Sequence, residues 1–329
     1  MQHSARWTPA TQPYPEHTLT SRPDVPARRA SSCATPRPNT FLIGSMKSGT
    51  TYLSELLGAH PAVFMSSPKE PCYFVDPQPL RKVWPYMWEG GFWRSPERYL
   101  SLFAGASSAS VIAEASTVYA QAPLFSRVPE RILNFNPDAK FIYVLRDPIE
   151  RTISHYWHRV RWWGERRSLM DALRKDPQYT DVSDYARQLD AYLEHVPWRR
   201  IYTLTFEALL SDPFELSRLY AWLGIDPDFT PQVDRSWVNA SPDVVEQARG
   251  LGWLDRIRKS PRYNRIGHRI PRALRKLGVH LAVRPVRPVE VSLAQVYGYL
   301  RPIQLPQVDR LGELLNRSFP EWTTLYGEE

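Results

Sequence analysis

The feature that most constrains the fold is a short apolar segment that runs straight into a polar, glycine-bounded loop. Residues 40–43 read Thr-Phe-Leu-Ile, residues 44–49 form the loop, and a leucine-bearing segment follows at 50–58. A continuous apolar run of this length is typical of a strand that is buried on both faces of a parallel sheet. The leucines recur with helical spacing, and Gly58 ends that pattern. The order predicts a buried strand, a loop and a helix.

Further apolar segments alternate along the chain in the same way. Strands are predicted at 62–65, 111–113, 140–145 and 200–204, and helices at 128–135, from Pro148 onward and at 213–223. The aromatic, proline-rich stretch 68–93 lacks such periodicity and is predicted to be irregular. Alternation of strands with helices favours an α/β fold, a single P-loop-like domain with a central, mostly parallel sheet flanked by helices. Ligands of such sheets bind at the carboxyl ends of the strands.

Composition sets the domain organisation. The 329 residues, of which 43% are hydrophobic, are enough for one large domain. Residues 1–38 are rich in Pro, Ser, Thr, Arg and Ala and lack hydrophobic periodicity, so we expect a disordered tail there and the folded domain at 39–329. The two cysteines, Cys33 and Cys72, have neither a disulfide pattern nor zinc-ligand spacing, and no metal site is predicted.

The charge of the chain restricts its partners to anionic molecules without choosing among them. The formal net charge is +8, and the stretch 256–287 contains eleven Lys and Arg residues but no Asp or Glu. This stretch is interpreted as a solvated basic face, a flap over an anionic ligand, or a docking site for an anionic acceptor.

Apolar runs of membrane-crossing length are absent from the sequence. The first 38 residues have no apolar core of signal-peptide length, and no later stretch approaches the roughly 18 apolar residues of a membrane span. The sequence therefore predicts a cytoplasmic location with no membrane span.

The loop at 44–51 has the residue types of an anion site. Backbone N–H groups at a helix start have no partner within the helix, and glycines let the backbone approach an oxyanion closely. A Walker A loop, GxxxxGKS/T, would have its lysine where Thr50 stands, whereas here Lys47 lies three residues earlier, which disfavours an ATPase or GTPase. A plain strand-to-helix turn is the alternative interpretation. The candidate ligand-binding residues are Lys47, Ser48, Gly49, Thr50 and Thr51.

A second candidate phosphate site follows the strand at 140–145. Arg146 stands at the end of that strand, and Ser154 lies eight residues later in the helix that Pro148 opens. A guanidinium offers phosphate a planar, permanently charged fork, and a serine adds a hydroxyl donor. The alternative is that Arg-Asp-Pro only caps the helix, with Asp147 at the N-cap.

Together these motifs resemble those of the sulfotransferases that use 3′-phosphoadenosine 5′-phosphosulfate (PAPS), in particular the bacterial and heparan-sulfate-type branch. The resemblance implies that the loop binds the 5′-phosphosulfate, that Lys47 stabilises the leaving phosphate, and that Arg146 and Ser154 hold the 3′-phosphate. Shorter similarities cover most of 40–329. They are His60-Pro61, Lys69-Glu70-Pro71, Glu114-Ala115-Ser116, 205–224 and 314–322.

The resemblance also implies a catalytic base. In relatives of this branch, the glutamate that matches Glu70 acts as base, and a histidine often stands where this chain has Cys72. A structural ion pair of Glu70 with Lys69 is the alternative interpretation. Glu114, a second carboxylate at a strand end, is expected to orient the acceptor. Ala115 occupies a position at which some relatives have a lysine.

The predicted activity is transfer of a sulfuryl group from PAPS to a hydroxyl or amine by in-line displacement, without a metal. The acceptor is expected to be a carbohydrate, a lipid or a small molecule, and no nucleic acid partner is predicted. Two alternatives remain open. One is a nucleotide-dependent kinase with a degenerate P-loop, and the other is a binding module for anionic polymers carried by residues 256–287.

Overall fold

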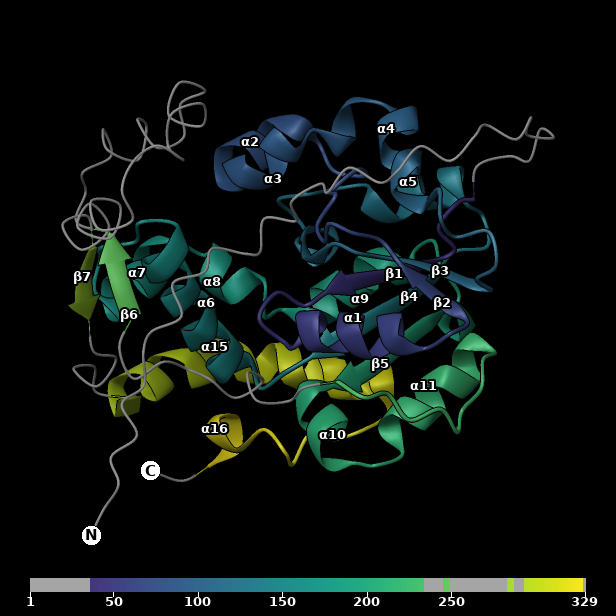
Figure 1. The fold of residues 1–329 in the computed structure, drawn as a ribbon. Helices are drawn as coiled ribbons and strands as arrows, with labels where there is room; N and C mark the ends of the chain where they lie inside the picture. Colours follow the sequence, from purple (N-terminus) through teal and green to yellow (C-terminus); the bar gives the residue numbers. More distant parts are fainter. Residues whose placement is uncertain (1–35, 234–244, 249–282, 287–292, 328–329) are drawn as a thin grey trace, which may run out of the picture. The chain divides into compact units, whose positions relative to one another are not determined.

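The computed structural model describes residues 36–233, 245–248, 283–286 and 293–327 of the chain (Figure 1). The chain divides into two compact units, residues 1–34 and 35–329, and every described residue belongs to the second. The predicted tail 1–38 and the basic stretch 256–287 therefore lie, apart from 36–38 and 283–286, outside the described residues.

A five-stranded sheet forms the centre of the second unit (Figure 1). Its strands lie in the order β2-β3-β1-β4-β5, and every neighbouring pair is parallel. They are β1 (Thr40–Gly44), β2 (Val63–Met65), β3 (Val111–Ala115), β4 (Lys140–Leu145) and β5 (Ile201–Thr205). The predicted α/β class and all five predicted strands are confirmed, with ends that differ by at most two residues.

Helices connect the strands and cover the sheet. The helices that follow or precede the central strands are α1 (Thr50–Ala59), α5 (Val128–Phe135), α6 (Pro148–Trp162), α10 (Phe206–Ser211) and α11 (Glu215–Leu223). The remaining longer elements are α4 (Pro96–Leu100), α7 (Leu169–Lys175), α8 (Gln178–Asp181), α9 (Tyr185–Leu193), α15 (Leu293–Leu315) and α16 (Thr323–Tyr326). Short 3-10 turns are η1 (Phe92–Arg94), η2 (Ser101–Phe103), η3 (Thr117–Ala120) and η4 (Trp198–Arg200), and β6 (Val245–Ala248) pairs antiparallel with β7 (Val283–Val286).

The prediction of an irregular segment at 68–93 is wrong for its second half. Two helices occupy it, α2 (Pro77–Val83) and α3 (Pro85–Gly90), each with a proline in its first turn. Proline fits the first turn because the N–H that it lacks would have no partner there. Leu80 and Trp84 are both buried and lie four residues apart, and Val83, Met87 and Trp88 pack against the same hydrophobic cluster.

Both faces of the sheet are packed, which explains the continuous apolar strands. Along β4, Phe141 and Tyr143 belong to the hydrophobic cluster on one face, whereas Ile142 and Val144 belong to the cluster on the other. Leu53 of α1 and Leu219 of α11 lie in the second cluster. A strand that buries alternate residues on opposite faces has no polar side, as the sequence of 140–145 shows.

Among the helices of the described ranges, none combines the length and the apolar character that crossing a bilayer requires.

Candidate active site

The loop between β1 and α1 is held close to neighbouring elements. The N–H of Ser45 donates to the carbonyl oxygen of Val144 on β4 at 2.8 Å. Gly49 has φ +81°, and a Cβ at this position would lie 2.2 Å from the ring of Phe206. Two features therefore require glycine at position 49: the left-handed backbone and the close approach of the ring of Phe206. The loop curls tightly over Phe206 at the carboxyl end of the sheet.

The start of α1 presents an anion-binding helix end. The helix begins at Thr50, its first turn contains no acidic residue, and no side chain caps its first N–H groups. Unpaired N–H groups and the helix dipole favour an anion at such an end. Ser48, just before the helix, is fully buried, and its hydroxyl lacks a hydrogen-bond partner. The residues that the sequence analysis nominated for binding an oxyanion lie at this helix start.

Lys69 contacts the same helix start, which the sequence analysis missed. Its ammonium group lies 3.1 Å from the hydroxyl of Thr50 and 3.1 Å from that of Thr51. Burial lowers the pKa of Lys69, and the charges of Glu70 and Glu55 oppose that shift. The only signal in the sequence was its place beside Glu70. The structure thus places a second half-buried lysine beside the loop.

Arg146 joins the second motif to the first. Its Nη1 donates to the carbonyl oxygen of Lys47 at 3.3 Å, and its Nη2 forms an ion pair with Glu150 at 2.7 Å. Its Nε is buried without a partner. Asp147 caps α6, since its carboxylate accepts from the N–H groups of Ile149 and Glu150. The Arg-Asp-Pro turn therefore caps the helix and also directs Arg146 toward the loop. Ser154 lies half-buried on α6.

A further guanidinium, also missed in the sequence, lies beneath the loop. Arg151 is fully buried, and it donates to the carbonyl oxygens of Met46 (3.4 Å) and Tyr179 and to the hydroxyl of Ser183. None of the residues in the described ranges forms an ion pair with it. Burial lowers its pKa to about 10. The side chain connects the loop to the α8 region through neutral acceptors.

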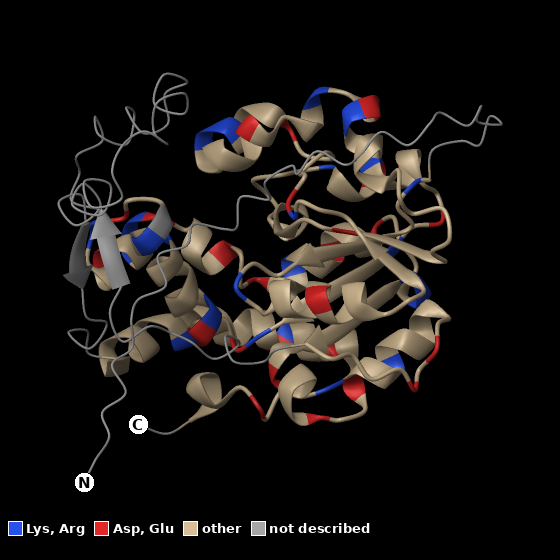
Figure 2. Ribbon diagram, in the orientation of Figure 1, with Lys and Arg blue, Asp and Glu red and all other residues tan. Residues whose placement is uncertain are grey.

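These cations act on one another electrostatically. The pKa of Lys47 is lowered to about 8, mainly by burial and in addition by the positive charges of Arg146, Lys69, Arg161 and Arg151. Elsewhere in the described part of the chain, basic and acidic residues are interspersed over the helices (Figure 2), so this concentration of positive charge is local. A ligand with several negative charges would relieve the repulsion.

Glu70 is oriented by a single threonine. Its two carboxylate oxygens accept from the N–H of Thr117 at 2.8 Å and from the hydroxyl of Thr117 at 3.0 Å. Burial raises the pKa of Glu70, while Lys69 and the two bonds from Thr117 lower it. The alternative of a Glu70–Lys69 ion pair is not observed at salt-bridge distance, because Lys69 binds the threonines of α1 instead. The carboxyl group is held in one orientation beside the cationic loop.

Glu114 does not have the exposure expected of a residue that orients an acceptor. Its side chain is fully buried, and its carboxylate accepts from the hydroxyls of Tyr99, Ser116 and Tyr119. Burial raises its pKa to about 7. Cys72 is also fully buried, and burial raises the pKa of its thiol well above the usual range, which disfavours a thiolate nucleophile.

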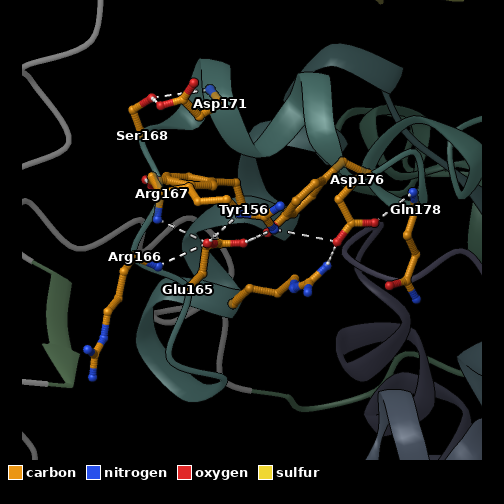
Figure 3. Close-up of polar contacts among 10 residues, drawn as sticks. Tyr156, Glu165, Arg166, Arg167, Ser168, Asp171, Asp176 and Gln178 are labelled. Carbon is orange, nitrogen blue, oxygen red and sulfur yellow. Dashed lines mark hydrogen bonds and ion pairs between the residues drawn. The ribbon is translucent and has the colours of Figure 1, made fainter. Parts of the chain in front are cut away.

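The end of α6 is braced by a polar network (Figure 3). The carboxylate of Glu165 accepts from the backbone N–H groups of Arg166 and Arg167 and from the hydroxyl of Tyr179. Arg159 forms an ion pair with Asp176 at 2.7 Å. The network fixes the far end of the helix that carries Ser154.

The sequence of this chain is similar to those of known sulfotransferases. Residues 38–231 match the profile described as "Sulfotransferase family". The chain is 34% identical over 133 residues to "Membrane-associated sulfotransferase kil1" of Dictyostelium discoideum, a match that covers 40% of this chain and 25% of that protein. It is 27% identical over 228 residues to human "Heparan sulfate glucosamine 3-O-sulfotransferase 3B1", covering 64% of this chain and 53% of the relative. The matches thus span a quarter and about half of these two relatives.

A solved structure shares the fold. The sulfotransferase from Alicyclobacillus acidocaldarius aligns with a TM-score of 0.61 at 23% identity, over 87% of this chain and 99% of that one. At this identity the likeness establishes a common architecture.

Proposed function

Because this chain belongs to the sulfotransferase family, we propose that it transfers a sulfuryl group from PAPS to a hydroxyl or amine of an acceptor. The observation that carries the proposal is the contact between Arg146 and the carbonyl oxygen of Lys47, which joins two separate phosphate motifs in one site. A donor with phosphate groups at both its 5′ and 3′ positions needs two such sites side by side. A nucleotide with a single phosphate chain would leave one of them without a ligand.

The donor fits the polar groups that the protein leaves unpaired. Ser48 Oγ and Arg146 Nε are buried without partners, and the N–H groups at the start of α1 have no side-chain cap. Buried donors without partners are costly, and phosphate oxygens would satisfy them. We assign the 5′-phosphosulfate to the loop, with Lys47, Ser48, Gly49, Thr50 and Thr51, and the 3′-phosphate to Arg146 and Ser154.

The reaction follows from the charges around that site. An acceptor oxygen or nitrogen attacks sulfur, a new bond to sulfur forms, and the bond between sulfur and the phosphate oxygen breaks. The electron pair of that bond stays on the leaving phosphate, and Lys47 stabilises the charge. The lysine is fully charged below its pKa of about 8. Positioning and electrostatics supply the catalysis.

Glu70 is the proposed base that takes the acceptor proton. Burial raises its pKa, and a carboxylate whose pKa is raised toward the operating pH accepts a proton more readily. The two bonds from Thr117 fix the carboxylate while leaving further lone pairs free to accept. Lys69, which contacts Thr50 and Thr51, is proposed as a second cation at the phosphosulfate end.

The catalytic unit is proposed to be residues 39–329, and the acceptor a carbohydrate or lipid. One relative is named for a glucosamine of heparan sulfate, which supports a carbohydrate hydroxyl or amine as the first class to screen. A cytoplasmic location stays a prediction.

The test is transfer of sulfur-35 from labelled PAPS to a panel of desulfated polysaccharides, glycolipids and small phenols. The wild-type chain should label at least one class, and Lys47→Ala and Glu70→Gln should each reduce labelling by about 100-fold or more. Lys175→Met removes a charge from an exposed lysine on α7 and should leave labelling unchanged. Magnesium-dependent turnover of ATP without transfer from PAPS would instead identify the kinase alternative.

A further inference from the structure

Residues at and just after the carboxyl end of β3 bind the segment that carries Glu70 through three separate contacts. The N–H of Glu70 donates to the carbonyl oxygen of Ala115 at 2.9 Å, and the N–H of Cys72 donates to Ser116 Oγ at 3.2 Å. Thr117 then binds both carboxylate oxygens of Glu70. Three consecutive residues of one strand end therefore fix the position of the proposed base.

Two residues of the segment that carries Glu70 have a strained backbone conformation. Glu70 has φ +60° and Cys72 has φ +54°, both in the left-handed region. Such conformations are unfavourable for residues with side chains and persist only when the surroundings enforce them. Ser116 directly follows β3, and its hydroxyl accepts the hydrogen bond from the backbone N–H of Cys72. The orientation of this hydroxyl therefore decides whether the backbone at Cys72 keeps its conformation.

Glu114 sets the orientation of Ser116. The hydroxyl of Ser116 donates to the carboxylate of Glu114 at 2.7 Å, which turns its lone pairs toward the N–H of Cys72. The carboxylate is itself fixed by the hydroxyls of Tyr99 and Tyr119, and the whole cluster is buried. A carboxylate that accepts from three buried hydroxyls is held in one orientation.

We propose that Glu114, acting through Ser116, is a positioning residue that holds the backbone of Glu70 and Cys72 in the conformation needed for proton transfer. The inference rests on the proposed function in its assignment of Glu70 as base. It assigns a role to a buried acid that touches neither donor nor acceptor. Glu114 acts on the reaction only by fixing where the carboxylate of Glu70 lies.

A matched pair of variants separates this role from simple stabilisation of the core. Ser116→Ala removes two hydrogen bonds, one to Glu114 and one from the N–H of Cys72. Tyr220→Phe removes one buried hydrogen bond, from the hydroxyl of Tyr220 to the carbonyl oxygen of Leu56, in the cluster on the other face of the sheet. Both variants lose buried hydrogen bonds, but only Ser116→Ala should affect the base.

The first readout is release of labelled sulfate from PAPS with water as the acceptor. We expect Ser116→Ala to lower the rate about tenfold at unchanged affinity for 3′-phosphoadenosine 5′-phosphate (PAP), and Tyr220→Phe to stay within about twofold of the wild type. Combining Ser116→Ala with Glu114→Gln should cost no more than the larger single effect, because both break the same link. Equal losses in Ser116→Ala and Tyr220→Phe, or additive losses in the double variant, would overturn the proposal.

The second readout does not depend on transfer. Carbon-13 labelling of glutamate carboxyl groups, with Glu70→Gln to assign the resonance, gives the pKa of Glu70 directly. In Ser116→Ala the segment should loosen and the pKa of Glu70 should fall toward the ordinary value of 4.5, whereas Tyr220→Phe should leave that pKa unchanged. An unchanged pKa in Ser116→Ala would contradict the role of Glu114. Failure of the wild type to bind PAP would contradict the proposed function and leave this readout intact.

Discussion

Arg146 donates a hydrogen bond from Nη1 to the carbonyl oxygen of Lys47 at 3.3 Å, although 99 residues separate them. The contact arises because β1 and β4 are parallel neighbours, so the turns after both strands leave the sheet at the same edge. The carbonyl of Lys47 accepts this bond while its backbone has φ +71°. The cation of the second motif therefore helps to shape the loop of the first.

Removal of Arg146 should abolish selectivity for the 3′-phosphate. In Arg146→Ala we expect the affinity for PAP to fall by about 100-fold, and that for adenosine 5′-phosphate, which lacks the 3′-phosphate, by much less. Glu150→Gln keeps the arginine but removes its ion-pair partner, so it should bind PAP at least as tightly as the wild type. Calorimetric titration of the three proteins with both nucleotides gives the ratio of the affinity for PAP to that for adenosine 5′-phosphate. An equal loss of affinity for the two nucleotides in Arg146→Ala would contradict the assignment.

Lys69 should contribute to binding at the phosphosulfate end. We expect Lys69→Met to weaken PAP binding by about tenfold, because it removes a half-buried charge and leaves the hydroxyls of Thr50 and Thr51 without their shared donor. Lys175→Met changes the net charge equally at an exposed site. Equal PAP affinity in Lys69→Met and Lys175→Met would show that Lys69 acts only on the fold.

Binding of PAP should take up a proton in alkaline solution. The pKa of Lys47 lies at about 8 instead of 10.5, mainly because of burial, and a bound anion would raise it again. At about pH 9 a titration in two buffers with different ionisation enthalpies should reveal net proton uptake, reduced in Lys47→Met. Proton release in the wild type would contradict the assignment.

The lowered pKa of Lys47 also predicts how the stability of the ligand-free protein depends on pH. Because the folded pKa of Lys47 is lower than the unfolded value, the unfolded chain binds more protons between pH 8 and 10.5. This group therefore makes the ligand-free protein more stable as the pH rises through that window. Lys47→Met should lack this part of the pH dependence in thermal melts.

Gly49→Ala should damage both fold and binding. The added Cβ would lie 2.2 Å from Phe206 at φ +81°, so we expect about 2–4 kcal/mol of destabilisation and loss of PAP binding. Gly164→Ala is the matched control, since Gly164 has φ +71° but an added Cβ would meet nothing within 4 Å. It should cost only the backbone strain of about 1–2 kcal/mol. Similar destabilisation in both variants would show that the close approach of Phe206 to Gly49 does not affect the stability of the fold.

The sheet could be predicted from the sequence because each strand is buried on both faces and therefore has a continuous apolar run. Glycine and proline marked most element ends, as at Pro148 and Gly224. The helices α2 and α3 were not predicted, because each of them spans about two turns or fewer, which is too short to establish a helical period.

The candidate site was only partly accessible from the sequence. Lys47 and Arg146 lie in contiguous motifs, so local spacing identified them. Lys69 and Arg151 reach the loop only through the tertiary fold, and nothing in their own neighbours marks that contact. Glu114 ends a strand as expected, but its tyrosine partners come from α4 and η3, and they draw it into the core.

The most direct test of the central claim is a calorimetric titration of the wild-type chain with PAP and, separately, with adenosine 5′-phosphate. The account predicts one PAP bound per chain, with an affinity at least about tenfold higher than that for adenosine 5′-phosphate, because only PAP has a phosphate for each of the two motifs. No binding of PAP, or equal affinity for the two nucleotides, would contradict it.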